Sequence, residues 1–232
     1  MDFAILQLVM SKVEQNIIHV YFMPGMAANP SIFEYINLPE NQFELHFLEW
    51  MIPEKNETLK DYANRMTAKI KHKNPVLIGV SFGGLLVQEM GKIIACKKLI
   101  VISSMKSKNE LPKRLKILKA TKAYKILPTQ LIGNIELLAK FVFGKTAIKR
   151  IELYKKYLSV SDKRYLDWAI EQIIFWDQAN PNPNAIYIHG DKDAVFPHSK
   201  SGNCVIIKGG THIMIINKYK WFNENLPKLI LN

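Results

Sequence analysis

A single serine set between glycines at the end of an apolar run constrains this chain more than any other feature. Residues 79–84 read Gly-Val-Ser-Phe-Gly-Gly; the run 75–80 predicts a short buried strand, and residues 85–94 predict the helix that follows it. Ser81 then stands on a sharp turn in which bulky neighbours would collide, so Gly79 and Gly83 supply the space. The hydroxyl of Ser81 is expected at the rim of a sheet, exposed as a nucleophile must be.

Two later stretches carry the groups that a nucleophilic serine needs. A second apolar run, 185–189, ends in Gly-Asp-Lys-Asp at 190–193, and a third, 204–208, ends in Gly-Gly-Thr-His at 209–212. A hydroxyl is a poor nucleophile at neutral pH, so it requires a base such as histidine. The histidine in turn requires a carboxylate that holds its tautomer and stabilises the cation. Serine, acid and histidine follow one another along the chain in that order.

In these stretches the chain resembles the α/β-hydrolase superfamily, in which a serine on a strand-turn-helix motif is followed by an acid and then by a histidine. The resemblance implies Ser81 as nucleophile, His212 as base and Asp193 as the orienting carboxylate. Asp191 lies in the same turn and is the alternative acid. Asp193 is favoured because in similar sequences the second aspartate of a Gly-Asp-x-Asp stretch reaches the histidine, whereas Asp191 is expected to cap the turn.

The same resemblance implies an oxyanion hole, in which two N–H donors face the negative charge that develops on a substrate carbonyl. Family members use the amide after the nucleophile, here Phe82, and an amide from the loop after an early strand. That strand is expected at 17–22 and the loop at 23–27, which indicates Met26 or a residue next to it. The loop has Pro24-Gly25 where the family often has His-Gly, but backbone donors make this change a minor one.

The order of predicted elements indicates an α/β fold with a mostly parallel, doubly wound sheet of about six strands. Strands are expected at 17–22, 43–48, 75–80, 97–102, 185–189 and 204–208, and helices at 30–37, 57–71 and 82–94. Residues 105–180 show helical periodicity without a clear strand, and the resemblance implies a helical cap there. The predicted organisation is a hydrolase core of residues 1–104 and 181–232 with an inserted cap of residues 105–180.

Composition argues against membrane insertion and secretion. No apolar stretch approaches the roughly 20 residues that span a bilayer. Residues 1–10 lack the basic start and the cleavage site of a secretion signal. Cys96 and Cys204 lie in apolar segments, which favours reduced core thiols. A cytoplasmic location is therefore the expectation.

The histidines outside the motif predict no metal centre. They show no metal-ligand spacing with one another or with the cysteines: His19, His46, His72 and His198. Hydrolysis through a serine also requires no organic cofactor. Nucleic acid is not an expected partner, because no recognition motif accompanies the positive charge.

The positive charge of the chain is concentrated in the predicted cap. The chain has 32 Lys and Arg against 20 Asp and Glu, a net charge of +12. Residues 106–164 contain sixteen Lys or Arg and four Asp or Glu, so the surplus of positive charge in this segment equals that of the whole chain. A basic cap could attract an acidic acyl carrier protein, an acyl-coenzyme A or an anionic surface. The alternative is that lysine-rich helix faces simply remain solvated.

Together these features predict a serine hydrolase that cleaves a carboxylic ester or thioester with an apolar acyl part through an acyl-enzyme on Ser81. Trp50, at the catalytic rim, and Trp168, in the predicted cap, are candidates for the substrate pocket, with core packing as the alternative for each. Two other functions remain open. One is cleavage of a carbon-carbon bond by the same three residues, and the other is an inert binding protein on a hydrolase fold.

Overall fold

The structure is a computed structural model that describes residues 17–126, 156–196 and 204–232. Three expectations lie outside the described residues: the interpretation of residues 1–10, the surroundings of His198, and the part of the predicted cap at 127–155. In the described part, no helix combines the length and the apolar character that crossing a membrane requires. Cys96 and Cys204 are free, half-buried thiols.

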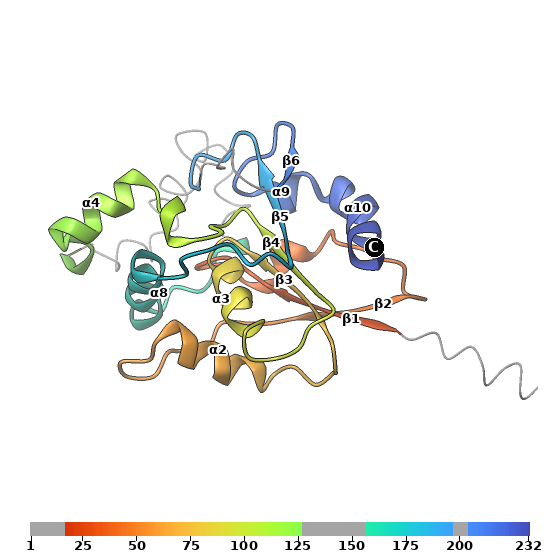
Figure 1. Cartoon of the computed structure of the whole chain (residues 1–232), viewed down its shortest axis with the longest axis horizontal. Helices are drawn as coiled ribbons and strands as arrows, with labels where there is room; N and C mark the ends of the chain where they lie inside the picture. Colours follow the sequence, from red (N-terminus) through yellow and green to blue (C-terminus); the bar gives the residue numbers. More distant parts are fainter. Residues whose placement is uncertain (1–16, 127–155, 197–203) are drawn as a thin grey trace, which may run out of the picture.

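A six-stranded sheet forms the centre of the molecule (Figure 1). Its strands are β1 (Ile18–Met23), β2 (Phe43–Phe47), β3 (Val76–Val80), β4 (Lys98–Ile102), β5 (Ala185–Gly190) and β6 (Val205–Ile207). They pair in the order β2-β1-β3-β4-β5-β6, and every pairing is parallel. The predicted six-stranded parallel sheet is thus confirmed, with each strand within two residues of its expected bounds.

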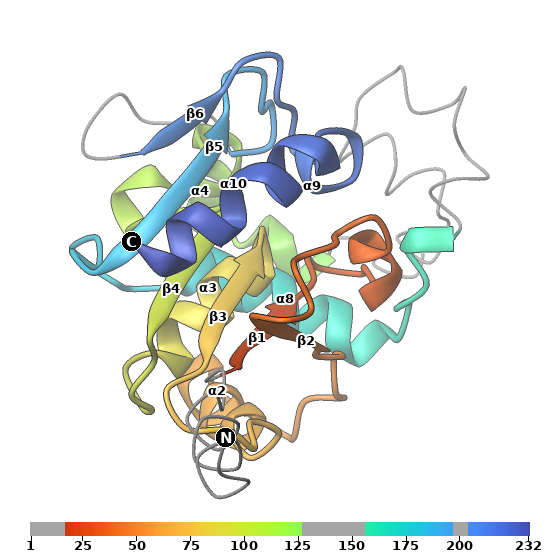
Figure 2. The ribbon, with the colours of Figure 1, turned by 90° about the vertical axis from the view of Figure 1, so that its right-hand side faces the viewer.

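Helices cover both faces of the sheet, as the alternation of elements predicts. Figures 1 and 2 show α2 (Leu59–Thr67), α3 (Phe82–Met90) and α8 (Lys163–Phe175) on one face, and α9 (Met214–Asn217) and α10 (Tyr219–Leu231) on the other. The central strand β3 is buried along its whole length, which explains why it reads as a continuous apolar run and not as an alternating one. Parallel strands end at one edge of the sheet, so the turns that follow them gather there.

The predicted helices are longer than the observed ones. The helix expected at 30–37 is a single turn, η1 (Pro30–Phe33), which begins after an Asn29 cap and is too short to be an α-helix. The helix expected at 82–94 ends at Met90, because Gly91 follows it and two β-branched isoleucines, Ile93 and Ile94, hold helix poorly. The helix expected at 57–71 extends over Leu59–Thr67 only and begins after Thr58, whose Oγ1 accepts the Asp61 amide at 3.2 Å.

The described part of residues 105–180 contains helices and no strand. These helices are η2 (Lys108–Glu110), α4 (Lys113–Thr121), η3 (Ala123–Ile126) and α8. Tyr165, Leu166 and Trp168 of α8 belong to the same buried cluster as the residues of β1, β3 and β4. In its described residues, the predicted cap therefore shares one hydrophobic core with the sheet. Its separation as a domain remains a prediction.

Candidate active site

Ser81 lies on a sharp turn between β3 and α3, as its glycine-flanked position predicts. Its backbone has φ 55° and ψ −120°, a conformation that residues other than glycine rarely adopt. The Ser81 amide donates to the carbonyl of Ile102 at the end of β4 (2.9 Å), which fixes the turn to the edge of the sheet. Backbone strain of this kind costs about 1–3 kcal/mol and persists only where the surrounding structure enforces it.

Two close backbone approaches explain the glycines around Ser81. A Cβ atom added to Gly79 would lie 2.3 Å from the carbonyl oxygen of Gly83. A Cβ added to Gly83 would lie 2.3 Å from the carbonyl oxygen of Pro24, in the loop after β1. Neither position has room for any side chain. Gly83 therefore allows the start of α3 to lie directly against the loop for which an oxyanion donor is predicted.

The structure brings the three predicted catalytic side chains into one hydrogen-bonded chain. The hydroxyl of Ser81 lies 2.9 Å from Nε2 of His212. Nδ1 of the same ring lies 3.0 Å and 3.2 Å from the two carboxylate oxygens of Asp193. His212 and Asp193 are buried, whereas Ser81 is partly exposed, so a solvent-borne molecule meets the serine first.

A third close approach brings the acid and the histidine together. A Cβ added to Gly190, at the end of β5, would lie 2.2 Å from the carbonyl oxygen of Gly210, after β6. The amide of Lys192 donates to that same carbonyl at 2.9 Å. The turn carrying Asp193 therefore lies against the turn carrying His212. Gly190 and Gly210 stand 20 positions apart in the sequence, so nothing local marks them as a matched pair.

Asp193 is held as a buried carboxylate. Its side chain has no exposed surface, and Oδ1 accepts the amides of Val195 (2.8 Å) and Phe196 (3.0 Å). Burial by itself raises the pKa of this carboxyl, but the charge of His212 and hydrogen bonds from His189 and His212 outweigh it and hold the pKa well below its usual range. Asp193 is thus ionised at neutral pH and available as a fixed negative charge beside the imidazole.

Asp191 has the separate role that the sequence predicts for it. Its Oδ1 accepts the amide of Gly209 at 2.7 Å, across the gap between the turns after β5 and β6. That contact caps the Gly209 turn, whose φ of 68° favours glycine. Asp193 and not Asp191 is therefore the carboxylate in contact with His212.

The loop between β1 and η1 lies beside Ser81, as an oxyanion loop must. A Cβ added to Gly25 would lie 3.3 Å from Cβ of Ser81 and 3.9 Å from its Oγ. Met26 is partly buried next to it, and Phe82 is the first residue of α3. The amide of Phe82 belongs to the N-terminal turn of a helix, where N–H groups point outward without intrahelical partners. The donor roles of Met26 and Phe82 remain predictions.

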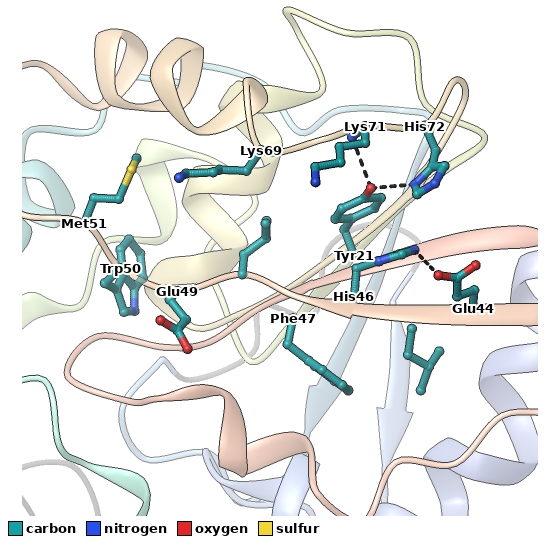
Figure 3. Close-up of a pocket in the computed structure, with 12 residues that line it drawn as sticks. Tyr21, Glu44, His46, Phe47, Glu49, Trp50, Met51, Lys69, Lys71 and His72 are labelled. Carbon is teal, nitrogen blue, oxygen red and sulfur yellow. Dashed lines mark hydrogen bonds and ion pairs between the residues drawn. The ribbon is translucent and has the colours of Figure 1, made fainter.

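Trp50 contacts this loop through both its polar group and its ring. Its Nε1 donates to the carbonyl of Gly25 at 2.9 Å, and its ring stacks on Phe82 with centroids 4.9 Å apart and an interplanar angle of 10°. Trp50 also lines a hollow of about 780 Å³ along the outer edge of β2, whose lining includes none of Ser81, Asp193 and His212 (Figure 3). Its predicted place in a substrate pocket remains a prediction.

Trp168 occupies a core position. It is 8% exposed, its Nε1 donates to the carbonyl of Glu57 at 2.7 Å, and it packs against Tyr62 with ring centroids 4.5 Å apart. These contacts favour the packing alternative for Trp168 over a pocket-lining role, because both its polar group and its ring are already occupied by the protein.

Three side chains around the site were not predicted to belong to it. His189 Nε2 lies 3.3 Å from Asp193 Oδ2, so the acid contacts two imidazoles. Arg114 of α4 donates to the carbonyl of Val195 (3.1 Å), and the Tyr165 hydroxyl accepts the amide of Ala27 (3.4 Å). In the sequence, His189 ends the apolar run 185–189 and belongs to no catalytic motif. Arg114 and Tyr165 belong to no motif in the sequence, so no local pattern marks them.

A histidine cluster that no spacing in the sequence indicates lies where β1, β2 and the segment after α2 meet. One nitrogen from each of His19, His46 and His72 lies within 4.8 Å of the others. These residues are far apart along the chain and on three different segments. Their spacing therefore contains no ligand motif, although the fold brings them together.

No protein-family model and no curated protein sequence matches the chain. Solved structures do match over nearly the whole chain. An esterase from Thermogutta terrifontis has a TM-score of 0.66 at 12% identity, covering 92% of this chain and 89% of the esterase.

Two further solved structures resemble the chain to the same degree. An enol-lactonase from Burkholderia xenovorans has a TM-score of 0.66 at 12% identity, covering 94% of this chain and 92% of the lactonase. A bromoperoxidase from Bacillus anthracis has a TM-score of 0.63 at 16% identity, covering 93% and 92%. At such low identity the likeness concerns the fold. Taken with the parallel sheet in the order β2-β1-β3-β4-β5-β6, it shows that the chain has the α/β-hydrolase fold.

Proposed function

We propose that the chain is a serine hydrolase that cleaves a carboxylic ester or thioester through an acyl-enzyme on Ser81. The observation that carries the proposal is the continuous contact from Ser81 Oγ to His212 Nε2 (2.9 Å) and from His212 Nδ1 to Asp193 (3.0 Å). A base within hydrogen-bonding reach of a hydroxyl, itself oriented by a carboxylate, is the arrangement that turns serine into a nucleophile. The resemblance in fold to esterases and a lactonase agrees with this chemistry.

The first half-reaction forms the acyl-enzyme. In the proposed mechanism Nδ1–H of His212 donates to Asp193, so that Nε2 accepts the proton of Ser81 as its oxygen attacks the substrate carbonyl. The amides of Phe82 and Met26 bind the oxyanion of the tetrahedral intermediate. The intermediate collapses when His212 returns the proton to the departing alcohol or thiol, which leaves the acyl group on Ser81.

The second half-reaction releases the acid. His212 takes a proton from water, the resulting hydroxide attacks the acyl carbonyl, and the proton returns to Ser81 as its oxygen leaves. The sum is one ester or thioester and one water converted to one carboxylic acid and one alcohol or thiol. Asp193 remains ionised throughout, which agrees with a pKa held below its usual range.

A fluorophosphonate probe tests the nucleophile. The oxygen of an activated serine attacks the phosphorus, fluoride leaves, and the protein gains a covalent adduct that intact-mass spectrometry detects. We expect one adduct on the wild type and none on Ser81→Ala, with Ser161→Ala, which removes an exposed serine, as the matched control. A folded wild type that resists the probe and hydrolyses no ester in a chain-length panel would support the inert binding protein instead.

We further propose that the basic segment 106–164 attracts an anionic substrate, such as an acyl group on an acidic carrier protein. Lys113 and Lys116 on α4 are exposed, and Arg114 between them donates to Val195, close to Asp193. Positive charge on this helix therefore lies near the site, where it can raise the encounter rate of an acidic partner.

Charge reversal tests this attraction. Lys113→Glu with Lys116→Glu is expected to raise KM for an anionic thioester by about 3- to 10-fold at low salt, with less effect at high salt because the attraction is screened. A double reversal of exposed lysines elsewhere, Lys208→Glu with Lys220→Glu, is the matched control. Equal losses with a neutral short-chain ester would show that the α4 lysines do not act through the charge of the substrate.

A further inference from the structure

A second cluster of chemically active side chains lies where β1 and β2 pair. In that pairing His19 is opposite Glu44 and Tyr21 is opposite His46. Side chains two residues apart on a strand share a face, so all four lie on the same face of the sheet. His72 reaches them from the segment after α2, and Figure 3 shows its ring directed toward Tyr21, above His46 and Glu44. The cluster therefore joins the edge strand, its neighbour and a loop.

Two imidazole nitrogens of this cluster face each other. His19 Nδ1 lies 3.1 Å from His46 Nε2. Two nitrogens bound at about 2.0–2.1 Å to one tetrahedral zinc ion are about 3.3 Å apart. The two carboxylate oxygens of Glu44 lie 3.4 Å from His19 Nδ1 and 3.6 Å from His46 Nε2, close to the same spacing. Two imidazoles and a carboxylate are thus already positioned at the separations that a shared metal ion imposes.

His72 is held ready beside this group. Its ring stacks on His19 with centroids 3.4 Å apart and an interplanar angle of 6°. Because the lone pairs of two parallel rings lie in separate planes, His72 must turn about its side-chain bonds before it can share an ion with His19. Its Nδ1 lies 2.7 Å from the hydroxyl of Tyr21, which also accepts the amide of Lys71 (3.1 Å). An oxygen partner on one ring nitrogen is typical of metal-binding histidines, since it leaves the other nitrogen free to ligate.

We propose that His19, His46, Glu44 and His72 form a binding site for a divalent transition-metal ion of the zinc type, separate from Ser81 and its partners. Imidazole and carboxylate are the donors that such ions prefer in proteins. The side chains of His19 and His46 are 23% and 22% exposed, and that of Glu44 is 57% exposed, so an ion can reach them from solvent.

The number of donors indicates what kind of site this would be. Four donors leave no open position on a tetrahedral ion, which is typical of a structural site. An ion here would fasten the edge strand β2 to β1 and to the segment after α2, and would stabilise the folded chain by mass action.

Titration of the full chain with zinc chloride tests the proposal, with calorimetry for affinity and thermal unfolding for stability. The expected result is one zinc ion per chain and a thermal midpoint that rises with zinc and returns with a chelator. His46→Phe is the most informative variant, since a phenyl ring retains the stacking on Tyr21 that His46 has, with ring centroids 4.4 Å apart, but provides no ligand. We expect it to weaken zinc binding by at least about 100-fold, more than the 10- to 100-fold typical of losing an outer partner.

Further variants separate the donors from their surroundings. Glu44→Gln is expected to weaken binding by about 10-fold or more, while Glu224→Gln, which alters an exposed carboxylate on α10, leaves it unchanged. His72→Ala is expected to weaken binding less than His46→Phe, because the His72 ring must first leave its stack. Each variant is compared in chelator as well, so that a general loss of folding is recognised by a lowered midpoint without zinc.

Three results would overturn the proposal. The first is no zinc binding by the wild type, and the second is equal affinity of the wild type and His46→Phe. The third is loss of binding in His212→Ala with retention in His46→Phe, which would place the ion at His212, His189 and Asp193 instead. Ser81→Ala is expected to bind zinc as the wild type does. Failure of the proposed hydrolase and failure of the proposed metal site are therefore recognised by different variants.

Discussion

The two groups of functional side chains lie at different parts of one sheet and are built in different ways. Ser81, Asp193 and His212 each occupy a tight turn directly after a parallel strand, at the common carboxyl edge. His19 and His46 instead lie on the faces of strands, and His72 on the segment after α2. The acid and base of the first group are buried, whereas the histidines of the second are half-buried. The first group is enforced by backbone contacts and the second by side-chain contacts.

This difference explains why only the first group left a motif in the sequence. A tight turn beside a strand requires glycines at fixed positions, and these can be seen next to the functional residue. A side chain on a strand face requires only that successive residues of the strand alternate between the two faces of the sheet. Substitutions in the turns and around the two groups measure how independent the groups are and how strictly the turns are required.

The largest expected effect separates the two aspartates of the turn after β5. Asp193→Asn removes the charge beside His212 and should lower kcat by about 10³- to 10⁴-fold, because the imidazole loses its orienting anion. Asp191→Asn alters only a turn cap and should cost less than about 10-fold in kcat and about 1 kcal/mol in stability. Steady-state ester hydrolysis and urea unfolding measure these effects. A larger kcat loss in Asp191→Asn would reverse the assignment.

The next effect tests the close approach of α3 to the loop after β1. Gly83→Ala inserts a methyl group 2.3 Å from the Pro24 carbonyl oxygen, so we expect a loss of about 3 kcal/mol or more in the free energy of unfolding. Gly91→Ala, at the end of α3 with φ −67°, should remain within about 1 kcal/mol of the wild type. Equal stability of the two variants in urea would show that the loop moves away without cost.

A smaller effect concerns Trp50, which contacts the Ser81 loop and also lines the hollow beside β2. Trp50→Phe retains a ring beside Phe82 but loses the hydrogen bond to Gly25, so kcat should fall by about 10-fold as the loop loosens. Trp168→Phe, which loses a comparable bond to Glu57, should cost similar stability and little kcat. If both tryptophans changed kcat equally, the role of Trp50 would be general packing. Zinc affinity is expected to remain unchanged in both variants.

The smallest effect is a dependence of stability on pH. The pKa of Asp193 is lower in the folded chain than its ordinary value of 3.8. A carboxyl of this kind adds stability above pH 3.8 and loses that contribution as the pH falls through 3.8 toward the folded value. Between pH 5 and pH 3 the wild type should lose about 1 kcal/mol more than Asp193→Asn. Urea unfolding at several pH values measures this difference. The same change in the free energy of unfolding in both proteins would contradict the assignment.

Much of the fold could be predicted because it depends on local rules. Continuous apolar runs identify buried parallel strands, and their alternation with helical segments fixes a doubly wound sheet. The predicted helix boundaries were less accurate where short-range signals compete. Asn29 and Pro30 begin a helix that ends after a single turn. Gly91 ends α3, although apolar residues continue beyond it in the sequence. The contact between Asp193 and His212 followed from the resemblance, whereas the second imidazole at Asp193, that of His189, is brought there by the tertiary fold.

The sequence by itself determined the sheet, the turn at Ser81 and the order of the three residues that meet there. The steric requirements of a tight turn are met by residues that are neighbours in the chain, so they can be recognised in the sequence. Only the tertiary structure decided which side chains support that site and which histidines gather at the edge of the sheet. Trp50 reaches Gly25, and His46 reaches His19, through strand register and loop packing. Such contacts depend on how distant segments are aligned, and no local pattern records that alignment.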